Sequence, residues 1–205
     1  MTEGLRERKK REARAAIAET ATTLFSERGF DAVTVAEVAA AAGVSAKTVF
    51  NYFPVKEDLV LESRERLEED LLRAVAERPA GTPAIAAVRK HTIAVARHLD
   101  MMPLERRQRF RCLLAGCPSI KARLRSLSLR TEERLAELLA RGTGVAAMEP
   151  EPQLAAAVLV TLSHLAYGVG PGGGGPEAGL DDTIGRIERA FDLIGEGLAD
   201  YAVRG

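Results

Sequence analysis

Apolar residues recur along this chain at the spacing of amphipathic helices, and period-two alternation rarely lasts beyond four residues. The first apolar stripe consists of Ile17, Ala21, Leu24 and Phe25. It predicts a helix that ends near Gly29. A long helix that starts near Lys56 has one apolar face, made of Val60, Leu67, Leu71 and Val75. The breakers Pro79, Gly81 and Pro83 end this helix.

Five further helices are predicted, over residues 83–99, 103–115, 118–141, 152–167 and 182–203. In four of the five a proline lies near the start, where its missing N–H group is tolerated. Gly116 and Gly142 are expected just past helix ends, as C-terminal caps. With two short helices before Pro54, the prediction is an all-α chain of about nine helices: a small three-helix domain, 1–55, followed by a larger helical bundle, 56–205.

The two short helices have the signals of a helix-turn-helix. Thr34 and Glu37 match the capping box T-x-x-E at the start of the first of them, whose buried stripe is Val35, Val38, Ala39 and Ala42. Gly43 permits the left-handed conformation that ends a helix abruptly, and Ser45 is a suitable N-cap for the next helix. A helix, a three-residue turn and a helix are therefore expected.

The second short helix has one buried and one polar face. At 100° per residue Val49 and Phe53 point inward, while Lys47 and Asn51 lie opposite, beside Thr48. Cation, amide and hydroxyl groups can reach base edges or phosphates, and asparagine can bind adenine with two hydrogen bonds. The alternative is an ordinary solvated helix, but the capping box, the glycine turn and the polar face together favour nucleic-acid binding.

Charge is unevenly distributed along the chain. The 29 basic and 29 acidic residues give zero net charge, which taken alone argues against a nucleic-acid partner. By segment, however, residues 1–14 carry +3, residues 57–77 carry −5, residues 105–130 carry +7 and residues 176–205 carry −4. Local fields decide what a surface attracts, so the neutral total does not exclude DNA.

The motif G-F-x-x-x-T-V-x-x-V-A from Gly29, with Y-F-x-x-K-E-x-L from Tyr52, strongly resembles the DNA-binding domain of the TetR family of transcriptional regulators. The resemblance covers about the first quarter of the chain. It implies a homodimer that binds a palindromic DNA operator, usually a repressor, and is released from it by a small-molecule effector. Residues 1–55 are then the DNA-binding domain with a basic N-terminal arm, and 56–205 the ligand-binding and dimerisation domain.

The resemblance also assigns DNA-binding residues by position: Thr34, Ser45, Ala46, Lys47, Thr48, Phe50, Asn51, Tyr52 and Lys56. Thr34 would hold phosphate, and Tyr52 and Lys56 would contact the backbone. The residues that would face the major groove are Ser45, Ala46, Lys47, Thr48 and Asn51. Phe50 departs from the tyrosine that is common there; it can contact a thymine methyl group or simply pack. The basic segment 6–14 precedes the first helix and either reaches the DNA or is a solvated tail.

Two apolar stripes near the C-terminus are expected to form the dimer interface that the resemblance implies. They consist of Leu154, Val158, Leu162, Leu165, Ile187, Phe191, Ile194 and Leu198. Small residues beside them would let helices approach closely, and a two-fold axis would match a palindrome. The alternative is that both stripes face the core of a single chain.

The effector pocket is expected among the middle helices. Its candidate lining residues are His91, His98, Met102, Arg107, Phe110, Arg111, His164 and Tyr167, with Met101 and Cys112 as further candidates. Arg107 or Arg111 would clamp an anionic effector. The favoured alternative for these arginines is pairing with the acidic helix 57–77.

Other classes of protein, such as enzymes and helical adaptors, have little support in the sequence. The chain has no H-E-x-x-H, G-x-S-x-G, phosphate loop or C-x-x-C, so we expect neither catalytic nor metal-binding residues and no cofactor. Cys112 and Cys117 indicate neither a metal site nor a disulfide framework. A helical adaptor would have no need of the polar face around Lys47 and Asn51. No signal peptide is evident and the apolar run 154–160 is too short for a bilayer, so a cytoplasmic protein is expected.

Overall fold

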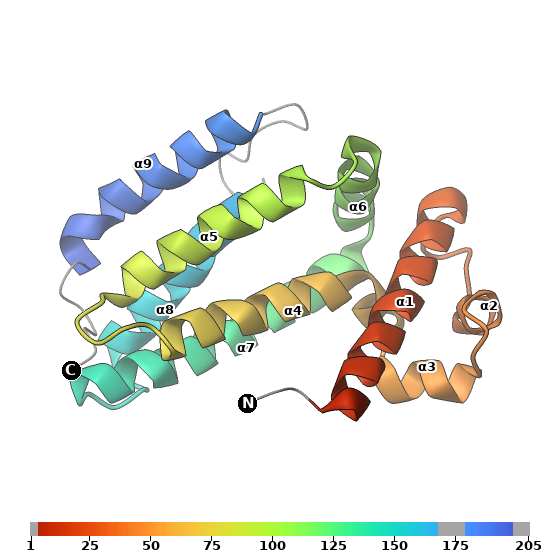
Figure 1. Cartoon of the computed structure of the whole chain (residues 1–205), viewed down its shortest axis with the longest axis horizontal. Helices are drawn as coiled ribbons and strands as arrows, with labels where there is room; N and C mark the ends of the chain where they lie inside the picture. Colours follow the sequence, from red (N-terminus) through yellow and green to blue (C-terminus); the bar gives the residue numbers. More distant parts are fainter. Residues whose placement is uncertain (1–3, 168–178, 199–205) are drawn as a thin grey trace. The chain divides into compact units, whose positions relative to one another are not determined.

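The computed structural model describes residues 4–167 and 179–198, and the regular secondary structure of this part is entirely helical (Figure 1). The helices are α1 (Leu5–Arg28), α2 (Val35–Ala41), α3 (Ala46–Tyr52), α4 (Lys56–Ala76), α5 (Ala84–Asp100), α6 (Leu104–Gly116), α7 (Pro118–Thr143), α8 (Pro150–Ser163), a short 3-10 helix η1 (His164–Tyr167) and α9 (Leu180–Leu198). The predicted all-α fold of about nine helices is confirmed. No helix in the described residues has both the length and the apolar content needed to cross a membrane.

The chain folds into two compact units, each made of two stretches of sequence. The first unit comprises Met1–Arg66 and Glu105–Ser126, and the second comprises Leu67–Leu104 and Leu127–Gly205. Helices α4 and α7 therefore contribute residues to both. The functional division expected after residue 55 stays a prediction.

The first unit is closed by a core of aromatic and β-branched side chains. Phe25 of α1, Val38 of α2, Val49 of α3 and Phe53 after α3 are almost completely buried in it. The rings of Phe25 and Phe30 meet edge to face, with centroids 4.9 Å apart. Each such side chain contributes about 1.5–3 kcal/mol when it is fully buried, so the cluster holds the short helices α2 and α3 in place.

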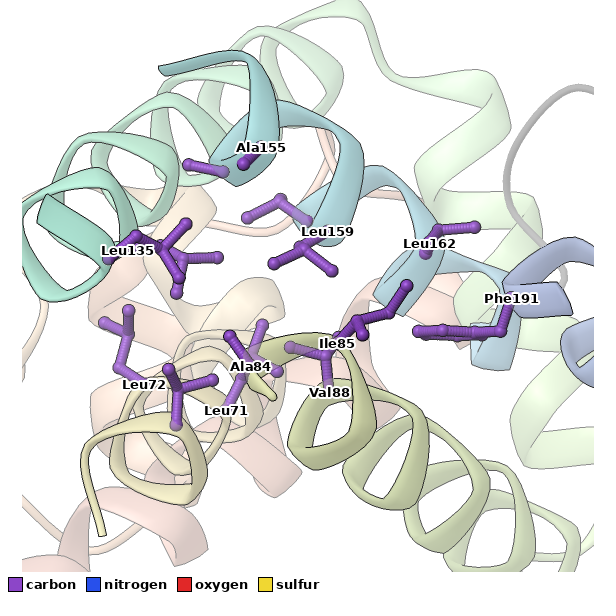
Figure 2. Packing of buried hydrophobic residues seen from close by; sticks show 14 of the residues in the cluster. Leu71, Leu72, Ala84, Ile85, Val88, Leu135, Ala155, Leu159, Leu162 and Phe191 are labelled. Atoms are coloured by element: carbon purple, nitrogen blue, oxygen red, sulfur yellow. The ribbon is translucent and has the colours of Figure 1, made fainter. Parts of the chain in front are cut away.

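The second unit has a separate core. Figure 2 shows Leu71 of α4, Val88 of α5, Leu159 of α8 and Phe191 of α9 converging in it, and all four are almost completely buried. Helix α5 packs against both α8 and α9. Helix α8 buries Ala155, Ala156, Leu159 and Val160 on the side that faces this core, whereas Leu154 on the same helix is exposed.

The basic segment 6–14 was expected to precede the first helix. It instead forms the first turns of α1. Arginine, lysine, glutamate and alanine all favour helix, and no glycine or proline interrupts them after Gly4. Arg8 and Glu12 also lie within 3.6 Å of each other, one helical turn apart. The basic residues are thus on an exposed helix, not a tail.

Several predicted helix ends are corrected. Gly116 is the last residue of α6 and Gly142 lies inside α7; the residue with positive φ after α7 is Gly144, at +71°. Helix α8 begins at Pro150 and its predicted last turn is the 3-10 helix η1. Helix α9 begins at Leu180, and the predicted end at residue 203 lies outside the described residues.

Candidate nucleic-acid interface

The capping box of α2 is formed as predicted. The Thr34 hydroxyl accepts a hydrogen bond from the Glu37 amide at 3.2 Å, and the Thr34 amide donates to the Glu37 carboxylate at 2.7 Å. Arg28 donates to the same carboxylate at 2.6 Å. The backbone hydrogen bond from Thr34, and then Arg28, lower the pKa of Glu37 to about 2. The start of α2 is therefore held by a carboxylate that remains ionised.

The turn between α2 and α3 also follows the sequence prediction. Gly43 has a φ of +67°, and the Val44 amide donates to the Ala39 carbonyl at 2.9 Å. Ser45 caps α3, because its hydroxyl accepts from the Thr48 amide at 3.0 Å. The Ser45 and Thr48 hydroxyl oxygens are 2.8 Å apart. Two predicted contact residues thus meet at the N-terminus of α3.

Helix α3 has the two faces that the sequence predicts. Val49 is completely buried, while Lys47 and Asn51 are exposed. Phe50 has 51% of its surface exposed, so its ring is available for contact. Of the other predicted contact residues, Thr34 and Ser45 are exposed. The partly exposed ones are Ala46, Thr48, Tyr52 and Lys56.

Lys56 has a partner that sequence reasoning missed. Its ammonium group donates to the Phe30 carbonyl at 2.5 Å and lies 4.3 Å from the centre of the Phe30 ring. It also lies 5.4 Å from the Phe25 ring centre. These contacts attach the start of α4 to the loop before α2, across 26 positions of sequence. Contact of Lys56 with the DNA backbone stays a prediction.

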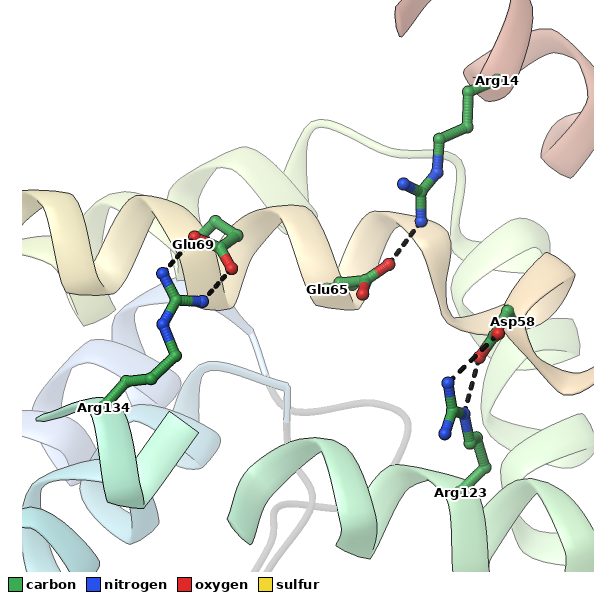
Figure 3. Close-up of polar contacts among 6 residues, drawn as sticks. All are labelled: Arg14, Asp58, Glu65, Glu69, Arg123 and Arg134. Atoms are coloured by element: carbon green, nitrogen blue, oxygen red, sulfur yellow. Dashed lines mark hydrogen bonds and ion pairs between the residues drawn. The ribbon is translucent and has the colours of Figure 1, made fainter. Parts of the chain in front are cut away.

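Acidic residues of α4 are paired with arginines (Figure 3). In the first unit Arg14 donates to Glu65, and Arg123 donates to both oxygens of Asp58, at 2.7 and 3.2 Å. The Arg14 guanidinium group also lies 5.1 Å from the centre of the ring of Phe53, the residue that follows α3. In the second unit Arg134 donates to Glu69. No local motif signals these pairs, because the partners lie on different helices.

The pairing expected for Arg107 or Arg111 with the acidic helix stays a prediction. In the same basic segment, Arg123 pairs with Asp58 of α4. Arg106 instead pairs with Glu19, at 3.1 Å, and Arg109 lies 3.9 Å from Glu105. Arg107 and Arg111, the two candidates for an anion clamp, are partly buried. Their role in effector binding stays a prediction.

The predicted effector residues are divided between the two units. Arg107, Phe110 and Arg111 belong to the first; His91, His98, Met102, His164 and Tyr167 belong to the second. Burial lowers the pKa of His91, although Asp70 opposes this change.

A polar cluster in the second unit was not anticipated. Glu68 of α4 is buried and accepts a hydrogen bond from the Thr131 hydroxyl at 2.5 Å. His164 lies 3.9 Å from the same carboxylate. Burial, and then the charge of Glu68, raise the pKa of Glu132. A signal was present in the sequence, because Glu68 precedes the buried Leu71 and Leu72 by one helical turn.

The residues predicted for a dimer interface fall into three groups. Leu162, Ile187 and Phe191 are buried in the core of their own unit. For these three residues the structure agrees with the alternative that the stripes face the core of a single chain. Val158, Leu165 and Ile194 are partly exposed, and the side chain of Leu198 lies outside the described part. Leu154 is 67% exposed, and Leu193, which was not predicted, is 83% exposed.

Comparison with known proteins gives the family. A model of the tetR family of bacterial regulatory proteins matches residues 17–63, and a model of the MftR C-terminal domain matches residues 82–199. The HTH-type transcriptional regulator TcmR of Streptomyces glaucescens is 31% identical over 156 residues, which cover 69% of this chain and 65% of TcmR. The chain belongs to the TetR family.

Solved structures have the same fold as this TetR-family chain. The SmeT–triclosan complex matches with a TM-score of 0.58 at 19% identity, over 93% of this chain and 94% of SmeT. GusR of Salmonella enterica matches with a TM-score of 0.56 at 19% identity, and AlkX of a Dietzia species with 0.56 at 18%. Both cover 92% of this chain and 96% of their own. The TetR family consists of regulators, not enzymes.

Proposed function

We propose that this TetR-family chain is a sequence-specific DNA-binding transcriptional regulator, and that it acts as a repressor. One observation carries the proposal. Helix α3 buries Val49 while it exposes Lys47 and Asn51, on a helix-turn-helix whose two helices both have hydrogen-bonded N-caps. A rigid helix with exposed donors on one side can enter the major groove, where each base pair has a distinct pattern of donors and acceptors.

The side chains of this face have separate roles in the proposal. Asn51 binds adenine through its amide, and Lys47 donates to guanine or to a phosphate. Phe50 contacts a thymine methyl group, because half of its surface is exposed and it lacks a hydroxyl to donate. Thr34 and Tyr52 contact phosphates on either side and fix the register of the helix.

We further propose that the protein is a homodimer, that its operator is palindromic and that a small-molecule effector releases it. A two-fold dimer places two copies of α3 in matching half-sites. The exposed Leu154 and Leu193 support contact between copies through α8 and α9. A cytoplasmic location follows from this role.

The test is a titration of the full chain against a labelled duplex from the DNA that flanks its own gene. Fluorescence anisotropy is measured at several salt concentrations for the wild type, for Lys47→Ala and for Lys47→Ala with Asn51→Ala. Lys90→Ala, which removes an exposed lysine of α5, is the charge-matched control.

We expect Lys47→Ala to weaken specific binding by about 1–3 kcal/mol, and the double variant to abolish the preference for the operator over unrelated DNA. Lys90→Ala should bind as the wild type does. If Lys47 meets only phosphate, the loss will be similar on all sequences and the salt dependence will become shallower. Unchanged affinity in the double variant would show that α3 is not the recognition helix.

A further inference from the structure

Helix α1 extends well beyond the core of the first unit. It has 24 residues and begins at Leu5, but its first buried residue is Ile17. Residues 5–16, which we call the α1 extension, are exposed or at most partly buried. At a rise of 1.5 Å per residue the extension is about 18 Å long. Packing of the core does not account for this part of the helix.

Arg14 attaches the α1 extension to the end of α3. Its guanidinium group lies 5.1 Å from the centre of the Phe53 ring, and it donates a hydrogen bond to Glu65 of α4. Phe53 follows α3 directly and is almost completely buried. Figure 1 shows the start of α1 next to α3 in the same unit. The extension therefore has a defined position beside the C-terminal end of α3.

Three cations form a row along the extension, each one helical turn from the next. Arg6, Lys10 and Arg14 are spaced at i, i+4 and i+8, so neighbours in the row differ by only 40° around the helix. The row continues the face of α1 that buries Ile17 and Ala21. Lys10 and Arg6 lie about 6 and 12 Å beyond Arg14 along the helix axis. The row thus leads outward from the contact with Phe53.

The acidic residues of the extension are matched by basic residues outside this row. Residues 5–16 carry six basic and two acidic side chains, a formal charge of +4. Glu12 lies 3.6 Å from Arg8, on the opposite side of the helix from the row. Glu7 is followed one turn later by Arg11. The charges of the row are left over.

Arg6 and Lys10 are the two members of the row without a counter-charge. Both are exposed, and within the described part of the chain neither forms an ion pair or a side-chain hydrogen bond. Like charges one turn apart repel each other and destabilise a helix. A polyanion bound along the row would remove this repulsion.

We propose that Arg6 and Lys10 bind the phosphate backbone of the DNA beside the half-site that α3 contacts. Long cationic side chains on an exposed helix donate to phosphate oxygens without reading the base sequence. Helix α1 is then a second DNA-contacting element, and Arg14 is a positioning residue that holds it beside α3. This inference rests on the proposed DNA-binding function.

An anionic membrane is the other polyanionic surface that attracts basic helices. Helices that lie on a membrane insert a face of large apolar side chains into it. In the α1 extension the apolar residues are Leu5 and three alanines, so no such face exists there. The contact with Phe53 also places the row next to the helix proposed to enter the major groove. Both observations favour DNA.

The test compares two double variants of the full chain that remove the same charges. The row variant is Arg6→Gln with Lys10→Gln. The control is Arg8→Gln with Lys9→Gln, which also removes one exposed arginine and one exposed lysine from the extension but leaves the row intact. Glutamine favours helix about as well as arginine and lysine do, and circular dichroism verifies the fold. Fluorescence anisotropy measures binding to an operator duplex and to an unrelated duplex of equal length at several salt concentrations.

We expect the row variant to lose about tenfold or more in affinity at low salt, by the same factor on both duplexes. The slope of log affinity against log salt should become shallower by about two for each bound chain, because each lost phosphate contact contributes about 0.9. The preference for the operator should remain, since the bases are read by α3. The control variant should change both quantities much less.

Unchanged affinity and salt dependence in the row variant, on DNA that the wild type binds, would overturn this inference and leave the proposed function intact. Equal losses in the row and control variants would also overturn it, because total charge and not the row would then be responsible. Binding to vesicles of anionic phospholipid that depends on the row, with DNA binding unaffected, would assign the row to a membrane instead. A wild type that binds neither duplex would overturn the proposed function and this inference together.

Discussion

Lys56 lies where the recognition helix passes into α4, and its ammonium group already has partners within the protein. A charge-assisted hydrogen bond to the Phe30 carbonyl and the nearby rings both stabilise the folded state. We expect Lys56→Met, which keeps the length of the side chain, to lower the free energy of unfolding by about 1–3 kcal/mol. Urea denaturation measures this change.

The same variant separates the two roles of Lys56. If the ammonium group serves only to neutralise a DNA phosphate, Lys56→Met will unfold at the same urea concentration as the wild type. The salt dependence of DNA binding would then become shallower. A loss of stability that disappears in the background of Phe30→Leu would assign the effect to the contact with that ring.

Glu37 makes stability depend on pH in the acid range. Its pKa falls from 4.5 to about 2 in the folded protein, because the ionised carboxylate accepts hydrogen bonds from Thr34 and Arg28. This contribution is therefore complete above pH 4.5 and is lost as the pH falls towards 2. We expect Glu37→Gln to remove that part of the pH dependence, as measured by urea midpoints across the range. Glu27→Gln, another exposed glutamate of the same unit, should leave it in place.

At the level of elements, the turn between α2 and α3 depends on glycine at one position. Gly43 has a φ of +67°, which side chains with a Cβ atom rarely adopt. We expect Gly43→Ala to lower the free energy of unfolding by about 1 kcal/mol or more and to weaken DNA binding. Gly116→Ala, at the end of α6, is the control, because alanine favours a helix there and meets no neighbour. Equal stability of the two variants would contradict a strained turn.

Local signals explain why the helix-turn-helix was predictable. Thr34, Glu37, Gly43 and Ser45 act on backbone groups within a few residues, so their roles are visible in sequence. The contact between Lys56 and Phe30 was not predictable from the sequence, because it joins positions that only the fold brings together. The cap predicted at Gly142 was wrong because α7 continues to Thr143, and the residue with positive φ that follows it is Gly144.

The same limit applies to the apolar stripes of α8 and α9. Periodicity identifies a buried face, but it does not say whether the face is buried by its own chain or by another. The structure places Ile187 and Phe191 in the core of their unit, whereas Leu154 and Leu193 remain exposed. Sequence alone offered no basis for separating these two pairs.

For the molecule as a whole, zero net charge constrains how the proposed regulator reaches its operator. The total field does not draw the chain to DNA, so non-specific binding is expected to be modest. The basic residues at the start of α1 are exposed on a helix and provide a local positive field. In the proposed homodimer, specific affinity then depends mainly on the contacts around α3 and on the presence of two copies of that helix.

That dependence makes the dimer testable through its exposed residues. We expect the wild type to be a dimer by sedimentation equilibrium, and Leu193→Asp to shift it towards monomer, because a carboxylate would be buried without a partner at the interface. Leu129→Asp, at an exposed leucine of α7, is the matched control and should remain dimeric. The monomeric variant should lose most of its operator affinity, since each copy then holds a single half-site.

Phe191 is buried within one chain, whereas Leu193 is exposed, so substitutions at the two positions should affect stability in different ways. Phe191→Ala removes a ring that is already buried within one chain, so it should lower the free energy of unfolding by about 3–5 kcal/mol, with the loss independent of protein concentration. The apparent stability of a wild-type dimer falls on dilution, because dimerisation contributes to that stability. In Leu193→Asp the apparent stability should depend less on protein concentration. A wild type that sediments as a monomer at micromolar concentration would contradict the dimer and the palindromic operator together.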